Sequence, residues 1–166
     1  MLFRSIGANL TLNRIFLNQE NSIQNNALSI QAKKQSTIQV TDSNHQNKGR
    51  VLDSVDVELF DQCRINTLNT SYLSNHSRFQ CKVTIKGTNS HAQLHGMAIH
   101  QENQKTFYNT HVIHDKEETE SHQLFKSLNK QNALFEYNGK VSVKKDAQKI
   151  ESYQLNQNIL LDEYAD

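Results

Sequence analysis

Short segments in which apolar and polar residues alternate recur along this chain at a nearly constant interval. The period of two is typical of β-strands that bury one face. The segments are ALSIQ (27–31), VDVELF (55–60), CKVTIKG (81–87), THVIHD (110–115) and KVSVKK (140–145). Their markers are Leu28, Val55, Val83, His111 and Val141. Each marker follows the previous one after about 27 to 30 residues, and a near-constant step of this size indicates a repeat architecture.

A second apolar segment follows each marker after a polar turn. These segments are marked by Ile38 and Val40, Ile65, Ala92 and Leu94, Leu124, and Ile150, and IGANLTLNRI (6–15) is a weaker copy ahead of them all. The pattern predicts a β-solenoid with about 27–30 residues per coil and two or three strands in each coil. Neighbouring coils would stack at about 4.8 Å. The alternative is a β-sandwich, which also places its turns at short, regular intervals.

The rarity of chain breakers agrees with long strand ladders. There is no proline, and glycine occurs at five positions only. Because each proline removes a ladder hydrogen bond, a proline-free chain suits continuous pairing. We therefore expect one β-helix domain over residues 1–166.

Composition narrows the function classes. The formal net charge is +1, which gives no strong attraction to nucleic acid or to an anionic membrane. No stretch approaches the roughly 20 apolar residues of a membrane span, and the N-terminus lacks the features of a signal peptide. Two cysteines, Cys63 and Cys81, are too few for a disulfide framework. We expect a cytoplasmic or organelle-stromal protein.

Asparagine and glutamine together supply 35 residues, about a fifth of the chain. They are interleaved with apolar residues, which favours a folded domain over a low-complexity tract. Gln154, Asn156 and Asn158 fall two apart, so a strand would direct all three to one face. We expect this amide row to form a polar ladder between coils or to face solvent.

Candidate catalytic or metal-binding groups are sparse. His91 and His95 would share one strand face, whereas His111 and His114 would point to opposite faces, which disfavours a shared ion. The acidic run at residues 114–122 is typical of a solvated turn. No nucleophile-elbow, P-loop or dinucleotide-binding pattern occurs. Both cysteines lie in alternating segments and are expected to be buried structural thiols. These observations favour a binding scaffold and no enzyme.

The last third of the chain resembles the end of the β-helix in the SufB/SufD family of iron–sulfur cluster assembly proteins. The resemblance rests on SxQLFK at 121–126, NGK at 138–140, DAQK at 146–149 and the amide row with its following leucines. The residues that carry it, and that are candidates for an interface, are Gln123, Lys126, Asn138, Gly139, Lys140, Gln148, Lys149, Gln154, Asn156 and Asn158. The approach through THVIHDKEETES is more similar to SufD than to SufB.

The resemblance implies a right-handed parallel β-helix that works in a complex of SufB, SufD and the ATPase SufC. It implies that a SufD-like subunit hydrolyses nothing itself, pairs with SufB through the C-terminal end of the β-helix and supports iron acquisition. An iron–sulfur cluster would then be held only within the complex, and the resemblance assigns no metal or cofactor to this chain alone.

The chain also departs from the family pattern. It stops at DEYAD (162–166), before the family's segment with Cys and His, and the helical regions at either end of the family's β-helix, including the part that docks SufC, are expected to be absent. No catalytic or ligand residue can therefore be carried over. Open solenoid ends predict pairing with another chain, either a SufB-like subunit or a second copy. A SufB-like paralogue, a stand-alone β-solenoid interaction module and a β-helix enzyme acting on metal or carbohydrate remain alternatives.

Overall fold

The chain forms only β-structure in the part that the structure, a computed structural model, describes, residues 2–17, 19–45 and 48–164. The strands are β1 (Leu2–Ser5), β2 (Asn9–Phe16), β3 (Ile23–Ala32), β4 (Thr37–His45), β5 (Arg50–Leu59), β6 (Arg64–Tyr72), β7 (His76–Ile85), β8 (His91–His100), β9 (Lys105–His114), β10 (Glu120–Asn129), β11 (Leu134–Val143) and β12 (Glu151–Leu160). None of these residues forms a helix that could cross a membrane.

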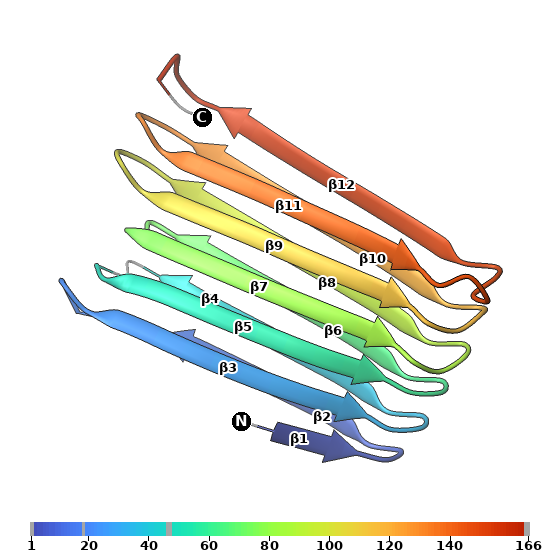
Figure 1. Ribbon diagram of the computed structural model, residues 1–166. Helices are drawn as coiled ribbons and strands as arrows, with labels where there is room; N and C mark the ends of the chain where they lie inside the picture. The colour runs from blue at the N-terminus through green and yellow to red at the C-terminus, as the bar shows by residue number, and fades with distance from the viewer. Residues whose placement is uncertain (1, 18, 46–47, 165–166) are drawn as a thin grey trace.

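The strands form two six-stranded sheets, which the chain visits alternately. Sheet A has the order β1-β3-β5-β7-β9-β11, and sheet B has the order β12-β10-β8-β6-β4-β2. The chain runs along one sheet, returns along the other and climbs one step with each turn, which is a right-handed course (Figure 1). All neighbouring strands are parallel, as coil-on-coil stacking requires and as the antiparallel sheets of a β-sandwich do not allow. The structure therefore confirms the solenoid, with two strands in each coil.

The length of a coil varies more than the sequence markers indicate. Val55 on β5 pairs with Cys81 on β7, whereas Gln123 on β10 pairs with Gln154 on β12, so the first of these coils is clearly shorter than the second. The marker alignment is wrong in three places. Val55 does not pair with Val83, and both Val83 and Val141 pair with Val112 instead of with its neighbour His111.

The misassigned markers lie on strands where both faces carry apolar residues. On β9, Val112 is fully buried, whereas His111 and Ile113 point outward. On β10, Phe125 points inward and Leu124 points outward. Ile150 precedes β12 and belongs to a turn. Because a shift of one residue exchanges the two faces of a strand, the errors at His111 and Leu124 inverted the predicted face.

The turns are closed by residues in the left-handed backbone region. Gln35, Gln62, Asn89, Glu118 and Lys149 have φ between 53° and 61° and recur once per coil along one edge of the column. The N–H of each of the first four donates to a carbonyl oxygen of the next coil, so the hydrogen-bond ladder continues through the turns. Gln35 Nε2 also donates to Gln62 Oε1 at 3.0 Å, an amide pair between stacked coils. These contacts hold non-glycine residues in a region that they seldom adopt.

The core is a column of inward side chains between the two sheets. Aliphatic residues fill the middle coils, with Val57, Val83 and Val112 stacked in register and fully buried. Aromatic rings fill the following coils, where Tyr108 lies 5.4 Å from Phe125 between ring centroids. Gly96 leaves the space that these two rings occupy, since a Cβ atom there would lie 2.3 Å from Phe125 and 2.9 Å from Tyr108.

One charged cluster is buried among the N-terminal coils. Arg14 on β2 makes two hydrogen bonds of 2.7 Å to Asp42 on β4 and bonds of 3.1 and 2.9 Å to Asp53 on β5. The two carboxylate side chains are 2% and 3% exposed. Burial raises the pKa of Asp53 to about 6, against the lowering effect of the Arg14 charge. The triad thus links sheet B to sheet A with two carboxylates around a single guanidinium.

Candidate functional site at the carboxy-terminal coils

Four inward positions of the last coils carry polar side chains. They are Thr110 on β9, Gln123 on β10, Tyr137 on β11 and Gln154 on β12. All four follow the strand alternation that directs alternate side chains to the interior. Gln123 is fully buried, and Gln154 lies above it in register. The signature glutamines of these two strands therefore belong to the inside of the solenoid.

These four side chains form one hydrogen-bond network. Gln123 Oε1 accepts from the Thr110 hydroxyl at 2.6 Å and from the Tyr137 hydroxyl at 3.2 Å. The Tyr137 hydroxyl oxygen in turn accepts from Gln154 Nε2 at 3.0 Å. Burial raises the pKa of the Tyr137 phenol, so this side chain stays a hydroxyl donor at neutral pH. The network ties the last strand of each sheet to the coil below.

Gly139 makes room for this network. Gly139 lies on β11 of sheet A, and a side chain at this position would point toward the interior. A Cβ atom there would lie 1.8 Å from Gln154 Nε2 and 2.3 Å from the Tyr137 hydroxyl. Any larger residue would displace one of these groups. The NGK signature thus contributes the absence of a side chain at its centre.

In the rest of the amide row, Asn158 bonds to a hydroxyl group, and the described residues show no amide-to-amide pair within the row. Asn158 Oδ1 accepts from the Ser127 hydroxyl at 3.0 Å, and Ser127 is also contacted by Asn129 Nδ2 at 3.2 Å. Asn156 pairs in register with Phe125, whose ring is buried. Among the described residues, Gln154 and Asn158 thus bond to hydroxyls of other strands, and all three amides are exposed.

The inner face of β12 is largely uncovered in the described part of the chain, although Gln154 reaches Tyr137 on β11. Within those residues β12 pairs only with β10, and Figure 1 shows it at the end of the column with no sheet A strand in front of it. The inward positions of Gln154, Asn156, Asn158 and Leu160 are consequently exposed, although their counterparts on β10 are buried. This face and the edges of β11 and β12 that no described strand pairs with form the candidate site, which we call the open end.

Comparison with protein families assigns this chain to a known family. The family model described as the SUF system FeS cluster assembly, SufBD core domain, matches residues 5–166. The chain belongs to the SufBD family. A search among curated proteins returned no match. Members of the family act as scaffold or assembly components for iron–sulfur clusters, and the match confirms the family resemblance of the C-terminal segment and extends it over all the coils.

The SufBD signature residues lie in four separate places. Gln123, Gly139, Gln154, Asn156 and Asn158 lie on the inner side of the last coils. Asn138 and Lys140 point outward from sheet A, and Lys126 points outward from sheet B on the opposite side of the column. Gln148 and Lys149 lie in the turn before β12, where Lys149 Nζ is 2.8 Å from Glu118 Oε1. Only the first group converges on the open end.

The cysteines and histidines of this SufBD domain show no arrangement typical of a catalytic or metal site among the described residues. Cys63 and Cys81 are both buried, as predicted, and burial raises the pKa of each thiol. His114 is buried between the hydroxyls of Thr119 at 2.7 Å and Ser121 at 3.0 Å, and burial lowers its pKa. His91 contacts Glu120 at 2.8 Å on the outer face of sheet B. Among the described residues, no three His, Cys, Asp or Glu side chains come together as metal ligands would.

Sequence reasoning missed the hydroxyl members of the network and the buried triad. Thr110 and Tyr137 carried no motif of their own, but Tyr137 lies two residues before Gly139 and so shares its face. Arg14 and Asp42 are 28 residues apart, which is the interval of the repeat. A charge of each sign at one coil spacing is the signal that could have predicted their contact.

Proposed function

We propose that this SufBD chain is a SufD-like scaffold component of iron–sulfur cluster assembly and that it acts by binding a SufB-like subunit. The open end carries the proposal, because it combines two edge strands with a row of inward amides that are exposed. Unpaired edge strands add strands from a partner readily. An ATPase of the SufC type completes the proposed assembly.

The proposed role is binding without catalysis. The polar network of Gln123, Tyr137 and Gln154 is built from neutral amides and hydroxyls, which suit hydrogen-bonded pairing better than acid–base chemistry. In this proposal the iron–sulfur cluster is the cargo of the complex, and the isolated chain holds neither cluster nor iron. The proposed location is the cytoplasm or an organelle stroma, where the two buried thiols stay reduced.

The test is the affinity of the chain for a SufB-like subunit, measured by titration calorimetry. We expect a stable pair, and we expect the double substitution Asn156→Leu/Asn158→Leu to weaken it at least tenfold or to lower the melting temperature of the chain. The substitution removes the hydrogen bond of Asn158 to Ser127 and places two apolar side chains on an exposed face. Hydrogen exchange of the β12 amides separates loss of pairing from fraying of the last coil.

The matched control is Asn9→Leu/Asn13→Leu, which makes the same chemical change at two exposed positions on the outer face of β2, at the other end of the column. It should leave the affinity unchanged. Equal affinity and equal melting of the open-end variant and the unsubstituted chain would refute the proposal. Pairing with a SufD-like subunit would assign the chain to the SufB type, a stable homodimer would make a second copy the partner, and binding to none of these would leave an interaction module outside cluster assembly.

A further inference from the structure

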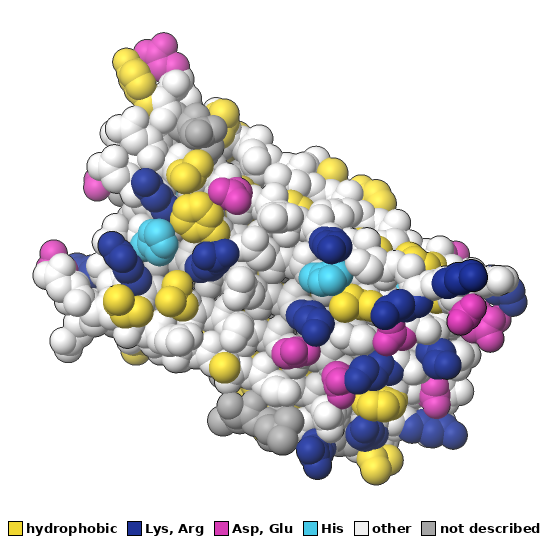
Figure 2. All heavy atoms as spheres, in the orientation of Figure 1, with side chains coloured by type: hydrophobic (Ala, Val, Ile, Leu, Met, Phe, Trp, Pro, Cys, Tyr) yellow, Lys and Arg dark blue, Asp and Glu magenta, His cyan; other side chains and the backbone are white. Residues whose placement is uncertain are grey.

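The outer face of sheet A carries a groove that the open end does not use. It has a volume of about 440 Å³ and crosses β5, β7, β9 and β11 along the axis of the column. Two signature residues, Asn138 and Lys140, line it from β11. Figure 2 shows basic side chains gathered on this face, with a histidine between two of them.

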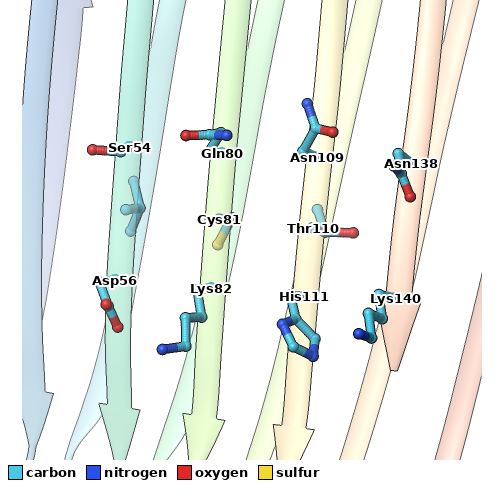
Figure 3. A pocket seen from close by; sticks show the side chains of 11 residues that line it. Ser54, Asp56, Gln80, Cys81, Lys82, Asn109, Thr110, His111, Asn138 and Lys140 are labelled. Carbon is cyan, nitrogen blue, oxygen red and sulfur yellow. The ribbon is translucent and has the colours of Figure 1, made fainter. Parts of the chain in front are cut away.

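The walls of the groove are two columns of polar side chains in register. One wall stacks Ser54, Gln80, Asn109 and Asn138, and the other wall stacks Asp56, Lys82, His111 and Lys140. Figure 3 shows the two columns side by side across the four strands. The residue between them on each strand points inward, so the floor is backbone, including that of Gly139. Four strands at about 4.8 Å spacing give the groove a length of about 14 Å, and its walls stand about 7 Å apart.

Most of the polar groups on these walls have no partner within the protein. Among the described residues, the side chains of Gln80, Lys82, Asn109, Asn138 and Lys140 form no hydrogen bond or ion pair. Three amides and two ammonium groups therefore present unused donors to the same furrow. His111 is occupied on one side, where its Nε2 lies 2.9 Å from the Ser142 hydroxyl.

The charge along the groove is uneven. In Figure 3 the Lys82 side chain leans toward Asp56, whereas the Lys140 side chain leans toward His111. Burial lowers the pKa of His111, and the positive charges of Lys140 and Lys82 lower it further. The part of the groove on β9 and β11 thus has an excess of positive charge, and an anion placed there would reduce the repulsion between these groups.

We propose that this groove binds a small organic anion with two or three carboxylate groups. The groove is long, and its donors are spread over two walls. This arrangement favours a ligand whose oxygens are distributed along a chain, and disfavours a compact tetrahedral ion such as phosphate. The groove lacks the features that select phosphate, since no arginine lines it and no helix N-terminus points into it. One carboxylate lies between Lys140 and His111, and the others accept from the amides of Asn109, Asn138 and Gln80.

The test uses citrate as the probe, added to the ¹⁵N-labelled full chain at low ionic strength and followed by amide chemical shifts. We expect saturable shifts confined to β7, β9 and β11. Lys140→Gln should weaken citrate binding about fivefold to tenfold, and Asn138→Ala about threefold. Neither side chain belongs to the core, so the fold should be preserved. The matched control is Lys126→Gln, which removes one positive charge from the outer face of sheet B and should leave the affinity unchanged.

Three results would overturn the assignment. Absence of saturable shifts would remove the site. An equal loss of affinity in Lys126→Gln and Lys140→Gln would reduce the effect to net charge. Inorganic phosphate, titrated at matched ionic strength, should bind more weakly than citrate, and an equal affinity would show that the groove does not select polycarboxylates. None of these results bears on pairing at the open end, because the groove faces outward from sheet A and the amide row faces inward from β12.

Discussion

Replacing Asp53 with asparagine tests how the N-terminal coils hold two carboxylates around one guanidinium. Asp53 is 3% exposed, and its two oxygens lie 3.1 and 2.9 Å from Arg14. Arg14 is also held by Asp42 through two bonds of 2.7 Å. The substitution Asp53→Asn keeps the shape of the side chain and removes one buried negative charge. It leaves Arg14 and Asp42 as a neutral pair.

The magnitude follows from the pKa of Asp53, which burial raises from 3.8 to about 6. Because the folded-state pKa is the higher one, the folded protein binds the proton more tightly than the unfolded chain does. The contribution of this carboxyl to stability is therefore complete below about pH 4 and is lost as the pH rises to about 6. Two pKa units correspond to roughly 3 kcal/mol. Asp53→Asn should remove this loss. The free energy of unfolding of the variant should therefore rise relative to that of the parent chain as the pH increases from 4 to 6.

The assay is urea unfolding followed by far-ultraviolet circular dichroism, with both proteins measured from pH 4 to pH 8. The quantity of interest is the difference in unfolding free energy between them as a function of pH. A fixed offset from the altered hydrogen bond to Arg14 does not affect its slope. Asp56→Asn, which removes a charge from the exposed face of the same strand, is the control for the loss of one negative charge. A flat difference for Asp53→Asn, or one equal to that of the control, would refute the reasoning.

Two further substitutions test the turns and the polar network. Gly139→Ala should destabilise the last coil by about 1–2 kcal/mol, because the added methyl group displaces Gln154 or Tyr137. Hydrogen exchange of the β12 amides measures this effect, and protection equal to that of the parent chain would contradict the role of Gly139. Glu102→Gly should raise the melting temperature, because Glu102 has φ of 60° and glycine relieves about 1 kcal/mol of backbone strain there. The control Asn103→Gly in the same turn should lower the melting temperature. A rise in both variants would exclude backbone strain as the cause.

The coil architecture was predictable because inward apolar residues recur at one interval. What the interval could not supply was the register. Coils of unequal length occur in one column, and a constant step places Val83 against the wrong neighbours. The strands themselves tolerate a shift of two positions, since Cys81 and Val83 are both apolar and share a face. Turn lengths set the register, and the turns contain few glycines and no prolines to mark them.

For the amide row, the sequence predicted the shared face but not the contacts. Spacing alone places Gln154, Asn156 and Asn158 on one face, and the structure confirms that they share it. Which of the two faces they occupy depends on the pairing of β12 with β10, which only the three-dimensional register reveals. Their partners, the hydroxyls of Tyr137 and Ser127, come from other strands and carry no local signal.

The amide row suits the pairing that we propose for the open end. If all the inward positions of β12 were apolar, they would stabilise a covered end. Without a partner, however, they would expose an apolar surface that promotes aggregation. Asparagine and glutamine side chains bond equally well to water and to another chain, so uncovering them costs little. Gln154 is anchored to Tyr137 on β11 and Asn158 to Ser127 on β10, and both side chains are still exposed. In the proposed pairing with a SufB-like subunit, these amides would gain hydrogen bonds to the partner.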